Sequence, residues 1–159
     1  SIKESLLDLE KKFPLKGNAL ATMNMKARIR MLMLYHYANT HNAIVLGTGN
    51  KTEMVLGYGT KYGDFGVDIE VLGKLWKTEV FQIAKALDLP EIFYTKAPSA
   101  ELVKDQTDEK EIGASYEIID RILQNEEKGV EQIDKQEIVR SILNRVAVNK
   151  HKTESIPIL

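Results

Sequence analysis

The feature that most constrains the fold of this chain is a continuous apolar run, residues 43–47 (AIVLG), that leads directly into a glycine turn. Such a run is typical of a strand that is buried on both faces of a parallel sheet. Thr48, Gly49 and Asn50 follow at once, and residues 51–56 can begin a helix. The sequence therefore predicts a strand, a glycine turn and a helix start, and ligands of open α/β sheets bind at such junctions.

A glycine-rich segment, residues 57–66, follows that short helix and contains four glycines. Glycine adopts positive φ angles at little steric cost and lets the backbone approach a ligand closely. We therefore expect this segment to be a loop that contacts a ligand. Apolar residues then alternate with Asp68 and Glu70 over residues 67–71, which predicts a short strand.

Helical periodicity accounts for much of the remaining chain. Asn24 and Asp134 are expected to cap the second and the last of the predicted helices. Residues 96–115 are polar and predict a mobile loop that can close over a site. The helices are expected at residues 2–13, 24–39, 78–88, 115–124 and 134–150.

The helix predicted from Asn24 is apolar on much of its circumference, so we expect it to be central in the fold. Lys26, Arg28 and Arg30 fall in its first turns, where positive charge opposes the positive end of the helix dipole. This placement favours a functional role for the three cations.

The composition excludes several classes of function. The 159 residues suit one domain, and 22 Lys and Arg against 23 Asp and Glu leave no general field for nucleic acid. A nucleic-acid module built on the basic segment 139–152 is therefore disfavoured. No cysteine is present to bind zinc or act as a nucleophile. No apolar run suits a bilayer or secretion, so we expect a cytoplasmic protein with no membrane partner.

Several motifs occur together in the order and spacing of one enzyme family. Over about residues 18–159, the chain resembles the carboxyl-terminal portion of an ammonia-dependent NAD synthetase. The family's SGGxDS loop, which lies upstream and grips the ATP phosphates, is not among the 159 residues. The motifs are NMKARIRM, VLGTGNKTE, LGYGTKYGD, KTEV, KAPSAEL, DQTDEKEIG and the final HK.

The resemblance implies a fold and a reaction. The fold would be the Rossmann-like α/β fold of the ATP pyrophosphatases (adenine nucleotide α-hydrolases), with residues 1–159 as the carboxyl-terminal portion of a single NAD synthetase domain. In this partial chain it would be mostly helical, with few parallel strands. The reaction would be amidation of deamido-NAD with ammonia and ATP, giving NAD, AMP and pyrophosphate through an acyl-adenylate. Magnesium and a homodimer are implied as well.

Two alternatives to this function stay open. One is the synthetase module of a glutamine-dependent NAD synthetase, although the stretch DIEVLGKLWKTEV is more similar to the ammonia-dependent branch. The other is a non-catalytic fragment, because the phosphate loop is absent. If the chain is catalytic, we expect the acidic residues Asp105, Asp108 and Glu109 to close over the adenylate.

The resemblance also implies roles on the ATP side of the site. Thr48, Lys77 and Ser99 would contact ATP, with Lys77 as the catalytic cation and helix amides beside it on the phosphates. Glu53 would hold Mg2+, which prefers oxygen ligands. The alternatives are a turn threonine, an exposed lysine, a turn serine and a surface glutamate.

A further set of residues would contact deamido-NAD, whose phosphates and carboxylate attract cations and whose riboses need hydrogen-bond partners. For Arg28 the alternative is a solvated basic helix face. For His151 and Lys152 the alternative is that their charges complement the negative end of the helix dipole. The set implied by the resemblance is Arg28, Lys61, Asp68, His151 and Lys152.

Overall fold

The computed structural model describes residues 2–12, 18–99 and 107–158. Its contacts divide the chain into two compact units. The first comprises Ser1–Gly49 and Gly59–Val71, and the second comprises Asn50–Tyr58 and Leu72–Leu159. Within the described ranges, no helix combines the length and apolar character that a membrane span requires.

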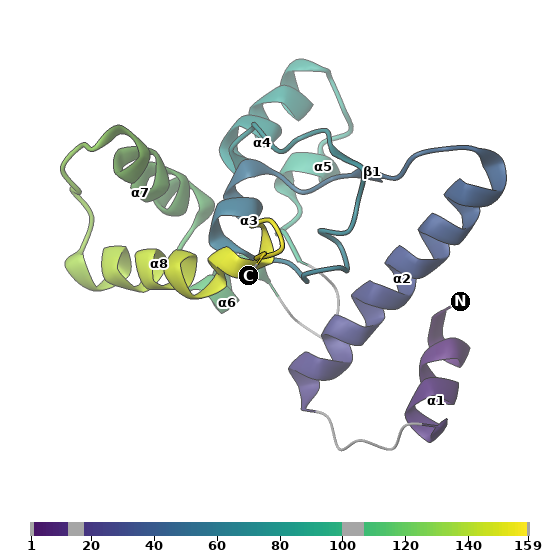
Figure 1. The fold of residues 1–159 in the computed structure, drawn as a ribbon. Coiled ribbons are helices and arrows are strands. Elements are labelled where there is room, and N and C mark those ends of the chain that lie inside the picture. The colour runs from purple at the N-terminus through teal and green to yellow at the C-terminus, as the bar shows by residue number, and fades with distance from the viewer. Residues whose placement is uncertain (1, 13–17, 100–106, 159) are drawn as a thin grey trace. The chain divides into compact units, whose positions relative to one another are not determined.

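The first unit holds two helices and a small parallel sheet. Helix α1 (Ile2–Lys12) packs against helix α2 (Ala19–His41). Strand β1 (Leu46–Gly47) pairs in parallel with strand β2 (Ile69–Glu70), with Leu46 opposite Ile69 (Figure 1). The predicted parallel strands are confirmed, although both are shorter than expected.

Helix α2 begins five residues earlier than predicted, so the assignment of Asn24 as its cap is wrong. The cap is Asn18, whose side chain accepts a hydrogen bond of 2.9 Å from the Ala21 amide. Asn24 lies inside the helix and accepts a hydrogen bond from the Thr60 hydroxyl. Because α2 begins at Ala19, Arg28 lies in its third turn, too far from the amino terminus for the helix dipole to oppose its charge.

The strand predicted to be buried on both faces is buried on one. Val45 and Gly47 are buried, whereas Ile44 and Leu46 are 59% and 56% exposed. In α2, only Ile29 and Ala38 are buried, so the helix is less central to its unit than its composition predicts. Its exposed large apolar residues are Leu20, Leu32, Met33, Leu34 and Tyr37.

Two glycines of the loop at residues 57–66 have a different structural role from the predicted one. Gly63 and Gly66 have no positive φ, and a Cβ on either would crowd neighbours that include Ala27 and Met31 of α2. Their small size therefore lets the loop pack against the helix. In the described part of this loop, positive φ occurs at Gly57 (+58°) and Tyr62 (+59°).

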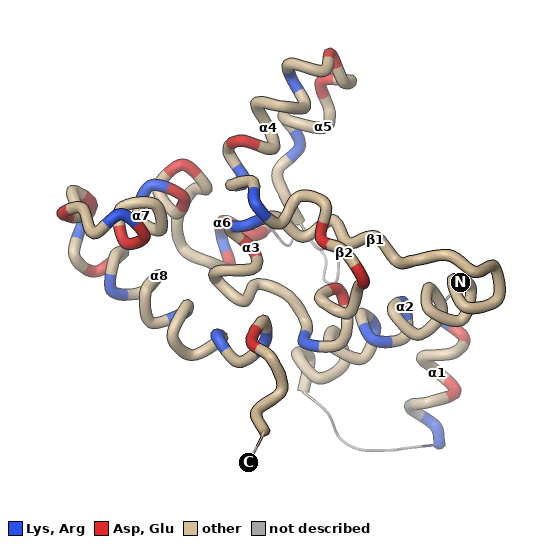
Figure 2. The backbone as a smooth tube through the Cα atoms, turned by 45° about the horizontal axis from the view of Figure 1, so that its top comes forward, with Lys and Arg blue, Asp and Glu red and all other residues tan. Residues whose placement is uncertain are grey.

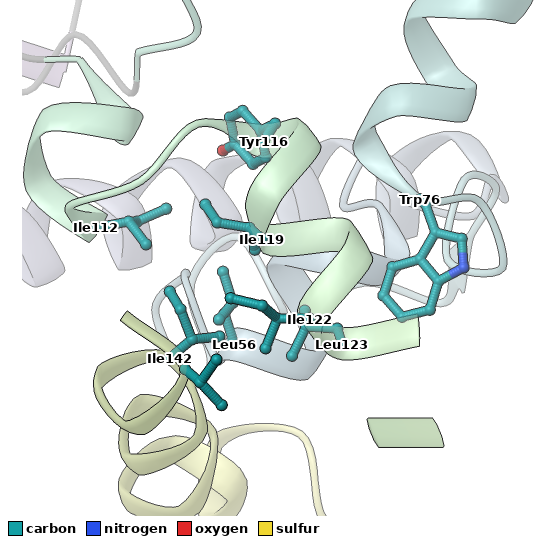
Figure 3. Close-up of a cluster of buried hydrophobic side chains, with 9 residues drawn as sticks. Leu56, Trp76, Ile112, Tyr116, Ile119, Ile122, Leu123 and Ile142 are labelled. Atoms are coloured by element: carbon teal, nitrogen blue, oxygen red, sulfur yellow. The ribbon is translucent and has the colours of Figure 1, made fainter. Parts of the chain in front are cut away.

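The second unit is a group of helices around one apolar core. Leu56, Ile119 and Ile122 have no exposed surface, and Ile142 packs beside them from another helix (Figure 3). Burial of this apolar surface is the main force that holds the unit together. The elements are α3 (Lys51–Leu56), α4 (Lys77–Ala86), α5 (Ile92–Thr95), α6 (Asp108–Ile112), α7 (Tyr116–Lys128), α8 (Gln136–Asn149) and η1 (Lys150–Lys152).

Two predictions in this unit are wrong. The segment 96–115 was expected to be a mobile loop, but it contains α6, whose Asp108 and Ile112 are buried. Residues 100–106 of that segment, including Asp105, lie outside the described residues. Asp134 does not cap α8; its carboxylate binds the guanidinium of Arg121 at 2.5 and 3.0 Å. The ion pair outcompetes the cap because both of its hydrogen bonds are charge-assisted.

Candidate functional site

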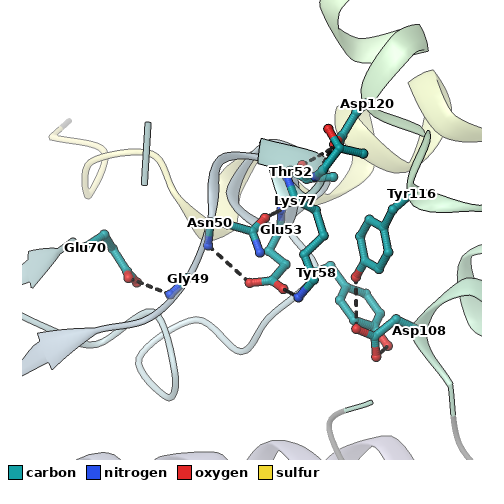
Figure 4. Close-up of polar contacts among 11 residues, drawn as sticks. Gly49, Asn50, Thr52, Glu53, Tyr58, Glu70, Lys77, Asp108, Tyr116 and Asp120 are labelled. Carbon is teal, nitrogen blue, oxygen red and sulfur yellow. Dashed lines mark hydrogen bonds and ion pairs between the residues drawn. The ribbon is translucent and has the colours of Figure 1, made fainter. Parts of the chain in front are cut away.

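An ion pair between Glu53 and Lys77 lies at the starts of two helices in the second unit. Glu53 is the third residue of α3 and Lys77 the first of α4, and the ammonium lies 3.0 Å from Oε1 (Figure 4). The side chains are 19% and 16% exposed. The ammonium also lies over the rings of Tyr116 and Phe81, at 5.3 and 5.7 Å from their centroids. Both charges are therefore held in place yet remain reachable from solvent.

Helix α3 is capped in a way that orients Glu53. Asn50 accepts a hydrogen bond of 3.0 Å from the Glu53 amide, and the Asn50 amide donates to Glu53 Oε2 at 3.2 Å. This reciprocal arrangement is a capping box. One carboxylate oxygen is thus directed to the cap and the other to Lys77.

A buried carboxylate joins the first turns of α3 and α4. Asp120 of α7, 2% exposed, accepts a hydrogen bond of 2.5 Å from the Thr52 hydroxyl and one of 2.9 Å from the Thr78 amide. The Thr52 hydroxyl oxygen in turn accepts from the Lys77 amide at 2.9 Å. Figure 4 shows Thr52 beside Asp120 and Lys77.

The first amides of α4 already have protein partners, which corrects one part of the predicted phosphate site. Thr52 binds the Lys77 amide, and Asp120 binds the Thr78 amide. The Trp76 amide donates to the Glu79 carboxylate at 2.8 Å. These amides therefore cannot bind phosphate in this arrangement. Of the groups predicted to meet phosphate here, the Lys77 ammonium remains as the candidate.

A cluster of tyrosines and carboxylates lies beside the ion pair in the same unit. Tyr116 donates to Asp108 at 2.9 Å, and the Tyr58 hydroxyl lies 2.9 Å from Glu111 and 3.2 Å from Asp108. Burial raises the pKa of both tyrosines, and the charge of Asp108 raises it further. Both hydroxyls therefore stay protonated at neutral pH and act as hydrogen-bond donors.

This cluster changes the interpretation of the acidic segment. Asp108 was predicted to close over an adenylate, but it is 5% exposed and bound to two tyrosines. Glu109 accepts a hydrogen bond from the Tyr116 amide at the start of α7. Both residues are parts of the packed structure, so the lid hypothesis is not supported at either.

The residues predicted to contact deamido-NAD separate into two groups, one in each unit. In the first unit, Arg28 Nε donates to the Lys61 carbonyl at 3.2 Å, so these two residues are neighbours. Asp68 accepts from the Tyr35 hydroxyl at 3.1 Å and from the Val45 amide at 2.7 Å. Arg28 and Asp68 are exposed on this unit.

Thr48 follows β1 directly and is exposed, as expected of a residue at the carboxyl end of a parallel strand. The next residue, Gly49, donates its amide to Glu70 Oε2 at 2.8 Å. A Cβ on Gly47 would collide with the same carboxylate. The glycine turn is therefore shaped by Glu70, which the sequence pattern did not single out.

The second unit contains three further predicted residues, Lys152, His151 and Ser99. Lys152 donates to the Gly57 carbonyl at 2.8 Å, at the end of α3. His151 Nδ1 lies 3.1 Å from the Val148 carbonyl oxygen, and the side chain is exposed. Ser99 follows Pro98, whose carbonyl accepts a hydrogen bond from the Asp108 amide. Lys152 thus has a structural contact, which the sequence alone did not reveal.

The basic segment 139–152 makes contacts within the second unit. Figure 2 shows its basic positions spread along α8 and beyond. The guanidinium of Arg145 lies over the Tyr58 ring and donates to the Glu111 carbonyl. Lys150 pairs with Glu154 at 3.0 Å. These contacts give the basic residues structural partners, which further weakens the nucleic-acid alternative.

The donor set around Glu53 fits a magnesium ion that arrives with phosphates. Mg2+ is commonly held by one or two carboxylates together with substrate phosphates and waters. Among the described residues no group of three or more His, Cys, Asp or Glu is arranged to hold a metal. A single carboxylate, Glu53, next to the ammonium of Lys77 suits this shared mode of binding.

Sequence reasoning missed Thr52, Asp120 and Tyr116 as members of this site. A usable signal existed for Asp120, because it lies on the same face of α7 as Tyr116 and Leu123, four residues before and three after. A carboxylate on the buried face of a helix needs hydrogen-bond partners. The sequence did not reveal which donors those would be.

Comparisons with known proteins identify the family to which this sequence is similar. A family model described as "NAD synthase" matches residues 1–156. An NH3-dependent NAD(+) synthetase of Methanococcoides burtonii is 52% identical over 136 residues, and the match covers 81% of this chain and 52% of that protein. One from Archaeoglobus fulgidus is 47% identical, covering 90% and 57%. The chain spans about half the length of these curated relatives.

Solved structures extend the match to the fold. The NMN synthetase of Francisella tularensis matches with a TM-score of 0.90 and 34% identity, over 100% of this chain and 64% of that one. The NH3-dependent NAD synthetase of Campylobacter jejuni, in complex with nitrate, matches with a TM-score of 0.82 and 31% identity, over 100% and 63%. The predicted adenine nucleotide α-hydrolase fold, mostly helical here with two parallel strands, is confirmed.

Proposed function

This chain belongs to the NAD synthase family, and from that premise we propose that it serves in the ATP-dependent amidation of deamido-NAD with ammonia. The products are NAD, AMP and pyrophosphate. The observation that carries the proposal is the Glu53–Lys77 pair, partly buried at the starts of α3 and α4. The Glu53 carboxylate and the Lys77 ammonium lie 3.0 Å apart, so when Mg2+ and ATP bind, the carboxylate can bind the Mg2+ and the ammonium can bind a phosphate.

The proposed reaction has two steps. The nicotinate carboxylate attacks the α-phosphorus of ATP, and the bond to the β-phosphate oxygen breaks to release pyrophosphate. Ammonia then attacks the acyl carbon of the adenylate, AMP leaves, and the nitrogen loses a proton. Adenylation makes the second step possible because AMP is a far better leaving group than the oxide of a carboxylate.

The residues of this chain contribute positioning and charge. Lys77 would contact the phosphates and stabilise the negative charge that develops on them in the first step. Glu53 would hold Mg2+, which supplies further charge neutralisation when bound. Thr48 and Ser99 would donate hydroxyl hydrogen bonds to ATP.

The dinucleotide would be bound mainly by residues of the first unit. Arg28 and Lys61 are exposed or partly exposed neighbouring cations, suited to the phosphates or to the nicotinate carboxylate. Asp68 would accept a hydrogen bond from a ribose hydroxyl. His151 and Lys152 are proposed as further contacts, with Lys152 exchanging its bond to Gly57 for one to the substrate.

Replacement of Lys77 tests the proposal most directly. In protein expressed from the complete reading frame, Lys77→Ala should lower ATP–pyrophosphate exchange and amidation by about 100- to 1,000-fold, as loss of a donor to developing charge does elsewhere. The matched control is Lys74→Ala, an exposed lysine three residues away. Full exchange and amidation by Lys77→Ala would remove Lys77 from the mechanism.

The substrate and the nitrogen source need their own test. The match to a solved NMN synthetase supports a second candidate, amidation of the acid mononucleotide that corresponds to NMN. We expect kcat/KM to favour deamido-NAD over the mononucleotide, since the curated relatives are named for NAD. We also expect ammonium to support the reaction and glutamine to fail, and the reverse result would favour a glutamine-dependent enzyme.

A homodimer and a cytoplasmic location complete the proposal. Helix α2 exposes Leu32, Met33, Leu34 and Tyr37, and exposed apolar surface of this kind is common at protein interfaces. Use of ATP as co-substrate favours the cytoplasm. Sedimentation at micromolar concentration should give twice the mass of the chain, and Leu34→Glu should return it to a monomer. A wild-type monomer would reject the dimer.

A further inference from the structure

The buried carboxylate of Asp120 has no role in the proposed chemistry, yet its two hydrogen bonds reach the residues next to the Glu53–Lys77 pair. Thr52 precedes Glu53, and Thr78 follows Lys77. Asp120 binds both, through Oδ1 and Oδ2 respectively. One side chain of α7 therefore ties the first turn of α3 to the first turn of α4.

The directions of these hydrogen bonds are fully determined. Asp120 as a carboxylate only accepts, so the Thr52 hydroxyl must donate its single proton to it. The lone pairs of that hydroxyl are then free to accept from the Lys77 amide. The chain of bonds runs from the Lys77 amide through Thr52 to Asp120, and the Thr78 amide donates to the other carboxylate oxygen.

A carboxylate is costly in this location. Asp120 is 2% exposed, and the described ion pairs do not include it. Burying a charge without a cationic partner opposes folding unless strong hydrogen bonds compensate. The positive end of the α4 dipole lies at Thr78 and offsets part of this cost. An acceptor-only side chain is nevertheless the group that satisfies both donors, because an amide would turn an N–H towards one of them.

We propose that Asp120 is a positioning residue, which fixes the Lys77 ammonium against the Glu53 carboxylate by holding Thr52 and the first turn of α4. Its described hydrogen bonds go to Thr52 and Thr78 and not to the Lys77 ammonium. The inference rests on the proposed function only for its kinetic consequence. Its geometric consequence, the placement of Lys77, is measurable without any substrate.

The first test measures the chemical accessibility of Lys77 in the unliganded 159-residue chain. In Asp120→Asn, acetylation of Lys77 by an N-hydroxysuccinimide ester, followed by mass spectrometry, should be at least about threefold faster, because the ammonium leaves its ion pair. Lys74 and Lys85, which the same digest reports, should be unchanged. Asp134→Asn, which removes the carboxylate that binds Arg121, is the matched control and should leave Lys77 labelling at the wild-type rate.

A second pair of variants covers the case in which Asp120→Asn fails to fold. Thr52→Val keeps the shape of the side chain but removes the hydroxyl that links Lys77 to Asp120, whereas Thr52→Ser keeps the hydroxyl. Faster labelling of Lys77 in Thr52→Val, with wild-type labelling in Thr52→Ser, supports the proposal. Wild-type labelling of Lys77 in folded Asp120→Asn or in folded Thr52→Val overturns it.

The kinetic test uses protein from the complete reading frame and distinguishes the two proposals. Asp120→Asn should lower kcat by about 10- to 100-fold, the effect of misplacing a catalytic group by about 1 Å, with KM for ATP changed less than threefold. In a Lys77→Ala background, the same change should cost less than threefold, because Asp120 acts through Lys77. An additive loss in that background overturns the positioning role, while full activity of Lys77→Ala alone instead rejects the role of Lys77.

Discussion

The two units of this chain hold their candidate site residues in different ways. In the first unit, Arg28 and Asp68 are exposed, and each makes one or two hydrogen bonds. In the second, Glu53 and Lys77 are less than one-fifth exposed and are supported by a cap, a buried carboxylate and an apolar core. The first arrangement suits recognition of a large polar ligand. The second suits precise placement of charge during a reaction.

The difference is physical as well as functional. Groups held in a packed, partly dry environment interact more strongly with developing charge than groups in water. Exposed cations are screened and contribute mostly to binding. Substitutions in the two units should therefore have different signatures, in stability as well as in kinetics.

The largest contrast is expected in core stability. Ile119→Ala removes a side chain with no exposed surface from the main apolar cluster and should lower the free energy of unfolding by about 2–5 kcal/mol. Ile29→Ala in α2 lies outside that cluster and should cost less. Urea denaturation measures the total, and hydrogen exchange locates the loss in α7 or α2. Equal costs at both positions would contradict the contrast.

A kinetic contrast of about tenfold is expected next. Arg28→Ala should raise KM for deamido-NAD by about tenfold, the effect of losing one exposed charge-assisted hydrogen bond, and leave kcat nearly unchanged. Lys77→Ala should instead lower kcat. Steady-state kinetics with deamido-NAD as the varied substrate separates the two. A loss of kcat in Arg28→Ala would mean that the first unit also takes part in the chemical step.

The buried tyrosines predict how stability responds to alkali. Tyr116 is 1% exposed and its pKa is raised above the ordinary value of 10.0. Because the unfolded chain loses this proton first, stability should fall as the pH rises above about 10, by up to about 1.4 kcal/mol per pH unit for this group. Tyr116→Phe should make the decline shallower in thermal unfolding between pH 9 and pH 11.

The corresponding residue for comparison in the first unit is Tyr35, whose pKa is also raised, by burial and by its hydrogen bond to Asp68. It is less enclosed than Tyr116, so Tyr35→Phe should alter the alkaline decline less. An equal change in both variants would show that the folded protein stabilises the protonated hydroxyls of Tyr35 and Tyr116 to the same extent.

The smallest effect is expected at the Arg121–Asp134 pair. The guanidinium lowers the pKa of Asp134 through a hydrogen bond, so its contribution to stability is present above the ordinary value of 3.8 and is lost as the pH falls below it. Asp134→Asn should be slightly less stable than the wild type at pH 7 and equally stable near pH 2. A difference in thermal stability that persists in acid would point to packing instead.

Part of the fold followed from local patterns. The turn after residues 43–47, the short helix α3 and helix α4 were predicted close to where they occur, because periodicity and breaking residues act over a few neighbours. The start of α2 was missed because Asn18 and Asn24 are equally good caps in isolation. Helix α6 was missed because its burial depends on Tyr58 and Tyr116, which are distant in sequence from one another.

In the candidate site too, local motifs predicted some features and the tertiary structure was needed for others. The chemical types at Thr48, Glu53 and Lys77 could be assigned from motifs that lie within a few residues. The role of each remains a prediction, but the structure brings Glu53 and Lys77 together across 24 residues. It also assigns Lys152 a contact with Gly57 across 95 residues, which no local motif anticipates.

The sequence by itself determined the family, the position of the glycine turn and the side chains available for chemistry, because these depend on residue identity and short spacing. Only the tertiary structure decided that Asp120 meets Thr52 and Thr78, which lie 68 and 42 residues away in the chain. Hydrogen bonds over such separations depend on which helix faces pack together. That packing is set by the whole apolar core and not by any local pattern.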